Sequence, residues 1–239
     1  TGFGLTYLDG GFNVVHVSFP TYRSGILLAG KMIKGKRIKL LEVNKMGMEE
    51  RVLVIKSDDV DRLCGGKTGV VNVPITSLFK VLTGGYFVER KIAEYDESIR
   101  QVIPYIVLKE NDEYIFFKRT THQTEKRLHN LITLGVGGHL NDEDSNDPLE
   151  AFQKGLWREL REEVNADVSD LEYVGLINEM ENPVSRVHIG VLYIAHVKYH
   201  GIVEAENFIE FRSKRLEPYI EEMEGWAKMA ALYLEPMQK

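Results

Sequence analysis

Hydrophobic and polar positions along the chain form short runs whose periods predict a succession of strands and helices. Runs rich in β-branched and aromatic residues, bounded by turn residues, predict strands at 51–55, 102–108, 114–118, 131–136, 171–178 and 186–197. The polar segment 109–113 separates two of these strands and therefore predicts a β-hairpin. A looser alternation predicts a further strand at 12–19, and the segments 57–63 and 75–82 predict helical turns.

The stretch 148–164 shows the spacing of an amphipathic helix with both ends marked. Asp147 is a suitable N-cap, Pro148 suits the first helical position, and Glu150 stands where a capping box needs an acid. Asn165 follows the last apolar position, and we expect it to end the helix in the left-handed conformation. The apolar stripe that should face the sheet comprises Phe152, Leu156, Leu160 and Val164.

The order of the predicted elements indicates a fold of the α/β (α+β) class, with a mixed sheet covered by helices. Residues 101–239 are expected to form the main domain, with residues 48–100 as an α/β segment packed on it. Residues 1–47 are expected to form an N-terminal extension. The stretch 216–234 predicts a closing amphipathic helix with these apolar positions at helical spacing: Leu216, Ile220, Met223, Ala227 and Ala230.

The composition is that of an ordinary globular protein and narrows the classes of function. Hydrophobic residues make up 44% and charged residues 28% of the 239 positions, which allows a normal buried core. The formal net charge of −6 argues against a dedicated nucleic-acid binder, because phosphate backbones attract basic surfaces. No apolar run reaches membrane-spanning length, and the first residues lack a signal-peptide pattern. The single cysteine, Cys64, excludes an internal disulfide and favours a cytoplasmic setting.

Three carboxylates gather on one side of the predicted helix. At about 100° per residue, Glu159, Glu162 and Glu163 fall within roughly 100° of one another, beside the apolar stripe. Like charges at this spacing repel by about 0.2–0.5 kcal/mol per pair, and a hard divalent cation such as Mg²⁺ or Mn²⁺ reverses that effect. Arg158 can hydrogen-bond Glu162 one turn later, and Gly155 leaves room for a group to approach the helix. The competing interpretation is an ordinary charged face in solvent.

The segment from Glu150 to Ala166 resembles the Nudix box. The family pattern is Gly, five residues, Glu, seven residues, Arg-Glu-aliphatic-x-Glu-Glu-x-Gly-aliphatic, and the charged residues and Leu160 match it at the right spacing. The final glycine of the pattern is Asn165 here, and Asp144 stands where the opening glycine belongs.

The wider resemblance covers residues 48–235 and points to a branch of predicted phosphoesterases, in which an α/β segment precedes the Nudix domain. It implies a Nudix-type α/β/α sandwich with a mixed central sheet. The nearest glycines upstream of the box are Gly137 and Gly138, which implies an acidic insertion at about 141–146. We expect this insertion to lie near the site.

The resemblance also implies a site and an activity. Glu159, Glu162 and Glu163 would hold Mg²⁺ (or Mn²⁺), the backbone carbonyl of Gly138 would complete the metal's ligands, and Arg158 would belong to the catalytic set. Glu162 or Glu163 would also accept the proton. The implied reaction is hydrolysis of a diphosphate linkage in a small molecule, expected to be a nucleoside diphosphate derivative. The structural positions of the box are Gly137, Glu150, Leu160 and Asn165.

Substrate phosphates need donors, and the candidates are Arg119, Arg127 and His139. For each of them the ordinary alternative is a surface charge or a structural histidine. His188 lies in an apolar strand and is expected to be a hydrogen-bonded core residue. The downstream acids are expected to be solvated: Glu179, Glu181, Glu204 and Glu206.

Two other classes of function compete with the hydrolase. One is a non-catalytic nucleotide-binding or regulatory module on the same fold, against which the intact carboxylates argue. The other is isomerisation of an isoprenoid diphosphate, which wants a catalytic cysteine, whereas Cys64 lies outside the expected Nudix domain. Many Nudix proteins are dimers, so a homodimer is a further expectation from the resemblance.

Overall fold

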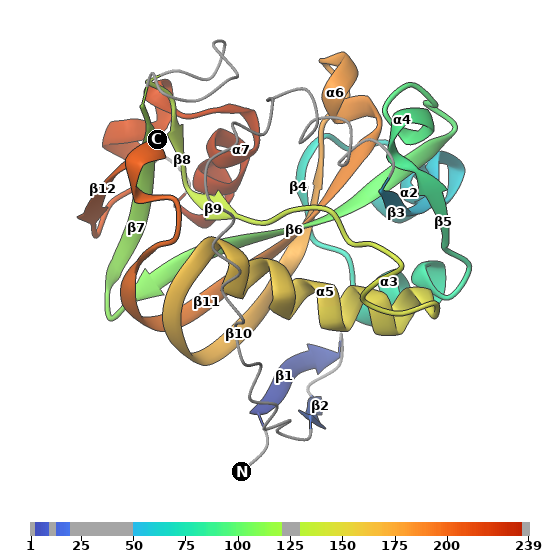
Figure 1. Cartoon of the computed structure of the whole chain (residues 1–239), viewed down its shortest axis with the longest axis horizontal. Helices are drawn as coiled ribbons and strands as arrows, with labels where there is room; N and C mark the ends of the chain where they lie inside the picture. The colour runs from blue at the N-terminus through green and yellow to red at the C-terminus, as the bar shows by residue number, and fades with distance from the viewer. Residues whose placement is uncertain (1–2, 10–12, 20–49, 121–129, 236–239) are drawn as a thin grey trace, which may run out of the picture.

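A single mixed sheet runs through the molecule (Figure 1). The structure is a computed structural model that describes residues 3–9, 13–19, 50–120 and 130–235. β6 and β11 pair in parallel, and the other neighbours in the main strand order are antiparallel. That order is β12 (Phe208–Ser213), β7 (Glu113–Arg119), β6 (Ile99–Glu110), β11 (His188–Ile202), β10 (Val164–Asn178) and β4 (Gly69–Val71).

Shorter strands pair with β6 and β7 outside this main order. β3 (Arg51–Lys56) pairs with β5 (Tyr86–Glu89) and with β6. β8 (Ile132–Thr133) pairs with β7, and β9 (Gly135–Val136) pairs with β6. A separate antiparallel pair joins β1 (Phe3–Asp9) to β2 (Asn13–Phe19), which confirms the strand predicted at 12–19.

Helices cover both faces of the sheet, as Figure 1 shows. One face carries α5 (Pro148–Glu163), α3 (Ile75–Leu82) and α2 (Ser57–Cys64), whose apolar residues share one core cluster with the sheet. The other face carries η3 (Glu217–Glu222) and α7 (Gly225–Leu234), which bury a second cluster. The α/β/α sandwich with a mixed sheet is therefore confirmed. Shorter pieces complete the chain: α4 (Arg90–Ala93), α6 (Pro183–Arg186) and η2 (Ala205–Asn207).

Alternate side chains of β6 belong to the two core clusters on opposite faces of the sheet. Val102, Ile106 and Leu108 belong to the cluster beneath α5, whereas Tyr105 and Val107 belong to the cluster beneath α7. Successive side chains of a strand point to opposite faces, so a strand buried on both sides has few polar positions. This explains why residues 102–108 appear in the sequence as a nearly continuous apolar run.

The segment before residue 100 is part of the same sheet. Val54, Ile55 and Lys56 of β3 pair with residues 99–101 of β6. Leu53 and Ile55 are buried in the same cluster as the apolar face of α5. The packing expected for residues 48–100 thus includes backbone pairing, and residues 20–49 lie outside the described part of the chain.

Local signals account for the hairpin and for the start of α5. Glu110 pairs with Glu113 across a two-residue turn, in which Asn111 takes a φ of 54°. The side chain of Asp147 accepts a hydrogen bond of 2.8 Å from the backbone N–H of Glu150, as a capping residue does. Within the described ranges, none of the helices combines the length and apolarity that crossing a bilayer requires.

Three predictions about elements are wrong. α5 ends at Glu163, and Asn165 lies in β10 opposite Gly201, so no left-handed residue ends the helix. The run 131–136 is split into β8 and β9, because β8 pairs with β7 whereas β9 pairs with β6. The closing helix predicted at 216–234 is interrupted at Met223, where the backbone is extended between η3 and α7.

The burial predicted for the closing stretch is nevertheless confirmed. The five apolar positions named for it are at most 6% exposed, namely Leu216, Ile220, Met223, Ala227 and Ala230. The spacing of apolar residues therefore predicted which positions face the sheet. It did not reveal the extended residue between two shorter helices.

Candidate active site

Glu159 lies at the centre of the predicted site. The buried stripe of α5 fixes the rotation of the helix, and Glu159 itself is 6% exposed. A Cβ on Gly138 would overlap the carboxylate of Glu159, so any larger residue there would have to displace this carboxylate. Burial raises the pKa of Glu159 to about 7, while Arg158 acts in the opposite direction. A buried acid thus faces the backbone of the glycine-rich turn.

Arg158 holds the surrounding acids in place. Its Nε and Nη2 donate to the two carboxylate oxygens of Asp144, each at 2.8 Å. Its Nη1 donates to Glu159 at 2.7 Å and to Glu162 at 2.9 Å. Its Nη2 also donates to the backbone carbonyl of His139 at 3.0 Å. The guanidinium therefore orients the helix carboxylates relative to the turn, and its hydrogen bonds to Asp144 raise its own pKa.

Asp144, which stands where the family pattern has its opening glycine, lies against Gly155 of α5. A Cβ on Gly155 would lie 2.5 Å from a carboxylate oxygen of Asp144 and 2.5 Å from Leu140. The group that approaches the helix at Gly155 is therefore the loop that carries Asp144. The side chain of Asp144 is 5% exposed and paired with Arg158, so this part of the acidic segment 141–146 lies against α5.

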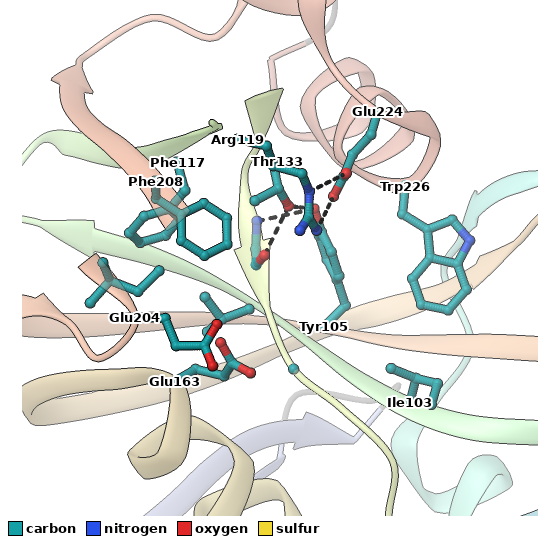
Figure 2. Close-up of a pocket in the computed structure, with 14 residues that line it drawn as sticks. Ile103, Tyr105, Phe117, Arg119, Thr133, Glu163, Glu204, Phe208, Glu224 and Trp226 are labelled. Atoms are coloured by element: carbon teal, nitrogen blue, oxygen red, sulfur yellow. Dashed lines mark hydrogen bonds and ion pairs between the residues drawn. The ribbon is translucent and has the colours of Figure 1, made fainter. Parts of the chain in front are cut away.

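Glu162 and Glu163 differ in their surroundings although they are neighbours on the helix. The Glu162 side chain is 58% exposed and accepts a hydrogen bond from Arg158. Glu163 is half-buried, and burial raises its pKa, with further contributions from Glu204 (raising) and Arg119 (lowering). Figure 2 shows the carboxylates of Glu163 and Glu204 turned toward each other beneath β9. Two acids this close favour a cation or a shared proton.

A cavity of about 310 Å³ opens beside Glu163. Its acidic lining consists of Glu163, Glu204 and Glu224, and Arg119 is the basic residue among those that line it. Arg119 donates to Glu224 at 3.1 Å and lies over the ring of Phe208, 5.4 Å from its centroid. The cavity also has an aromatic lining, visible in Figure 2: Tyr105, Phe117, Phe208 and Trp226.

Tyr105, which also lines the cavity, is hydrogen-bonded to the neighbouring segment that contains β8 and β9. Its hydroxyl accepts a hydrogen bond of 3.0 Å from the backbone N–H of Gly135 and lies 3.2 Å from the hydroxyl of Thr133. Its ring meets Trp226 edge to face at 5.9 Å. These contacts position β9, which lines the cavity. The glycine turn that follows β9 then faces the Glu159 carboxylate of α5.

Two known proteins are similar to this chain over about two thirds or more of its length. No family model matches the chain. Protein YmaB from Bacillus subtilis (strain 168) is 34% identical over 167 residues, which are 66% of this chain and 81% of that protein. The solved structure of Tm1382, a candidate Nudix hydrolase, is 39% identical with a TM-score of 0.71, and the match covers 77% of this chain and 98% of that one.

The chain belongs to the Nudix hydrolase family. It is accordingly an enzyme of the class that acts on phosphoanhydride bonds. A MutT Nudix hydrolase from Burkholderia pseudomallei is also similar, at 14% identity and a TM-score of 0.36 over 55% of this chain and 92% of that one. That similarity is too low to transfer the role of any residue.

The other residues predicted from the Nudix pattern have diverse surroundings. Glu150 is exposed and bonds Ser145 and Lys154 at the far end of α5, so its contacts are those of a helix start. Leu160 is buried in the core, as predicted. Arg127 lies outside the described residues. His139 is absent from the cavity lining, and its ring instead meets that of His188 at 5.6 Å.

One of the downstream acids was wrongly expected to be solvated. Glu179 is 7% exposed and accepts hydrogen bonds of 2.6 Å from Asn182 and Ser185. His188, by contrast, is buried and hydrogen-bonded, which confirms its prediction as a core histidine.

Sequence reasoning placed Glu163 in the site of this Nudix hydrolase but not the other two cavity acids, Glu204 and Glu224. Glu204 follows the long strand β11, and Glu224 precedes α7, so both are distant in sequence from the box. The available signal was the segment Glu224-Gly225-Trp226, which lies within the range 48–235 of the wider resemblance but carries no spacing that implies chemistry. Only the folded sheet brings these acids opposite α5.

Proposed function

We propose that this Nudix hydrolase cleaves a diphosphate linkage in a nucleoside diphosphate derivative, using Mg²⁺ or Mn²⁺. The metal would be held by Glu159, Glu162 and Glu163 together with the backbone carbonyl of Gly138. The observation that carries the proposal is the close approach of the Glu159 carboxylate to Gly138, directly beside a cavity that Glu163 lines. A cytoplasmic setting, where such substrates are present, is part of the proposal.

The donor set fits a hard divalent cation. All the proposed ligands are oxygens, which Mg²⁺ and Mn²⁺ prefer. Glu159 is buried with Arg158 as its counter-charge, and burial raises the pKa values of both Glu159 and Glu163. A divalent cation would offset the electrostatic repulsion between these carboxylates. Such an ion, when bound, neutralises charge on phosphate oxygens and lowers the pKa of a water molecule.

The protein's own side chains then have distinct roles. Glu163 is our choice for accepting the proton from the attacking water, because it is the proposed α5 ligand that lines the cavity. Arg158 positions Glu159 and Glu162 through its hydrogen bonds. Arg119 would contact a substrate phosphate by exchanging its bond to Glu224 for a bond to the phosphate.

The aromatic lining supports a nucleotide rather than inorganic diphosphate alone. Trp226 and Phe208 lie on the wall of the cavity, and a base can stack on such rings. A cavity of about 310 Å³ is at the lower end of the range for small-molecule sites. A nucleoside part held there would bring its phosphates toward Arg119 and Glu163.

The test is Mg²⁺-dependent phosphate release across a panel of nucleoside diphosphate derivatives. We expect Glu162→Gln and Glu163→Gln to lower kcat by at least about 100-fold, because loss of one charge-stabilising group costs about that much. Glu181→Gln, at an exposed position away from the cavity lining, is the matched control and should keep full activity. Activity that survives both site substitutions would reject these ligands. Tight nucleotide binding without turnover by the intact protein would instead favour the non-catalytic alternative.

A further inference from the structure

A second group of metal-ligating side chains lies outside the Nudix box. Glu94 follows α4, His139 follows the glycine turn, and His188 begins β11. One ligand atom from each of these residues lies within 4.8 Å of the ligand atoms of the other two. The two imidazole rings have centroids 5.6 Å apart at an interplanar angle of 64°. Segments far apart in the sequence therefore bring two imidazoles and one carboxylate together.

The hydrogen bonding of the two histidine rings resembles that of histidines that bind metals. Nδ1 of His188 lies 2.6 Å from the backbone carbonyl of Val184, which can only accept. Nδ1 therefore carries the proton, and Nε2 keeps a lone pair for another partner. Nε2 of His139 is buried and has no hydrogen-bond partner among the residues that the structure describes. A buried nitrogen without a partner costs free energy unless something occupies the position next to it.

Gln101 supplies independent support. It is 0% exposed, and neither its side-chain oxygen nor its side-chain nitrogen has a partner within the described ranges. It stands beside His188 in the parallel pairing of β6 and β11, and residues paired in this way project from the same face of a sheet. Buried polar groups in native proteins are nearly always satisfied. The unsatisfied side chain of Gln101 is paired with His188, and the unsatisfied nitrogen of His139 belongs to a ring that meets that of His188, so both point to a ligand near the His188 ring.

We propose that Glu94, His139 and His188 form a second metal site, separate from the carboxylates of α5, that takes a transition-metal cation of the Zn²⁺ class. Two imidazoles and a carboxylate suit zinc and leave a fourth position for water. A water in that position could hydrogen-bond the side chain of Gln101. The all-oxygen set proposed at α5 suits Mg²⁺ or Mn²⁺ instead, so ligand chemistry separates the two sites.

Arg90 and Arg100 are positive charges that such an ion would meet, and Nη1 of the buried Arg100 donates to the backbone carbonyl of His188 at 3.5 Å. The Nε of Arg90 donates to Oε1 of Glu94 at 3.2 Å, and its Nη1 lies 3.6 Å from a carboxylate oxygen of Glu50. Glu94 therefore has its second oxygen for the metal while Arg90 holds the first. Glu50 offsets the charge of Arg90 beside the site.

An occupied site would have a structural effect on the Nudix site. His139 directly follows Gly138, and its carbonyl accepts from Arg158. An ion bound to the His139 ring would tie the glycine turn to α4 and β11. The second metal would thus stiffen the backbone that faces Glu159, while the reacting groups remain those of α5.

The experiment titrates the metal-stripped full chain with Co²⁺, followed by its visible absorption, and then displaces Co²⁺ with Zn²⁺. We expect one tightly bound equivalent with the strong ligand-field absorption of four-coordinate Co²⁺. His139→Gln and His188→Gln should each weaken binding at least about tenfold, since even outer-shell partners of metal ligands contribute that much. His200→Gln, which changes an exposed histidine paired with Asp167, is the matched control and should bind as the wild type does.

Two further variants keep the outcome decisive. Glu94→Gln changes a side chain that is 23% exposed, so it should fold even if a histidine variant does not, and it should also weaken Co²⁺ binding. The double variant Glu162→Gln/Glu163→Gln should retain the Co²⁺ absorption whether or not hydrolysis is lost. Absorption that disappears in the double variant and persists in Glu94→Gln would place the ion at α5 and overturn the proposal. Wild-type binding no tighter than that of the histidine variants would overturn it as well.

Discussion

Two glycines position the site as much as its charged residues do, because their missing side chains allow other groups to come close. Gly138 lets the Glu159 carboxylate reach the turn, and Gly155 lets the loop of Asp144 reach α5. Arg158 then links both acids through short hydrogen bonds. Substitution at these positions therefore has consequences that differ from those of removing a charged ligand.

Adding one methyl group at Gly138 should disturb the site more than removing a surface charge. Gly138→Ala places a Cβ against the Glu159 carboxylate. We expect a loss of about 1–3 kcal/mol in the free energy of unfolding, typical of overpacking, and loss of metal-dependent hydrolysis. Gly84→Ala is the control, because the nearest atom to its Cβ is a backbone oxygen at 3.4 Å. Urea unfolding and phosphate release measure both effects, and a stable, active Gly138→Ala enzyme would contradict this account.

Glu159 should make the metal-free protein less stable as the pH rises. Its pKa in the folded state is about 7, above the ordinary value of 4.5, because it is buried. The folded protein therefore keeps a proton that the unfolded chain has released between these two values. The free energy of unfolding contributed by this group is greatest below the lower value and falls as the pH rises through the window.

Urea unfolding in EDTA across that pH range measures the slope of the free energy of unfolding against pH. Glu159→Gln cannot ionise, so the part of the slope that falls between the two pKa values should disappear in this variant. An identical pH dependence in both proteins would show that Glu159 ionises normally. Excess Mg²⁺ should also reduce the slope in the wild type, since it stabilises the charged form.

Among the elements, α5 determines where the chemistry is placed. Its buried stripe sets which side of the helix faces the sheet, and the carboxylates follow from their spacing. This part of the site could be predicted from sequence, because periodicity and capping act within a few residues. The end of the helix could not, since Asn165 joins β10 by pairing with Gly201, a partner that only the folded chain supplies.

A cavity under α5 should cost far more than the same change on the surface. Leu156 is 3% exposed within the main core, so Leu156→Ala should lower the free energy of unfolding by about 2–5 kcal/mol. Leu232→Ala, at a side chain that is 37% exposed on α7, should change it by less than about 0.5 kcal/mol. Chemical denaturation of both variants measures this difference. Equal effects would mean that α5 is not anchored by its stripe.

At the scale of the whole molecule, residues 50–98 and the Nudix domain share one sheet and one core. Leu53 of β3 is fully buried in the same cluster as the α5 stripe. From the sequence, the order of elements predicted the layers, yet it could not show that β3 pairs with β6, because strand pairing is non-local. For the same reason Glu204 and Glu224 could not be assigned to the cavity before the fold was known.

Loss of packing before residue 100 should therefore be felt across the whole protein. Leu53→Ala should lower the urea midpoint reported by the fluorescence of Trp157 and Trp226, both of which lie after residue 100, with a cost of about 2–5 kcal/mol. Ile92→Ala, at a side chain that is 50% exposed, is the control. A tryptophan transition that stays in place while circular dichroism shifts would show two independently unfolding units.

The direct passage from α5 into β10 limits how this enzyme can diversify. Glu163 is the last helical residue and Val164 the first of the strand, and the carbonyl of Glu163 accepts a hydrogen bond of 2.9 Å from Val203. One residue inserted before Glu163 would turn its carboxylate by about 100° around the helix, and one inserted after it would reverse the inward face of the strand. We therefore expect lineages that change substrates to vary the lengths of other connections, while this joint keeps its length.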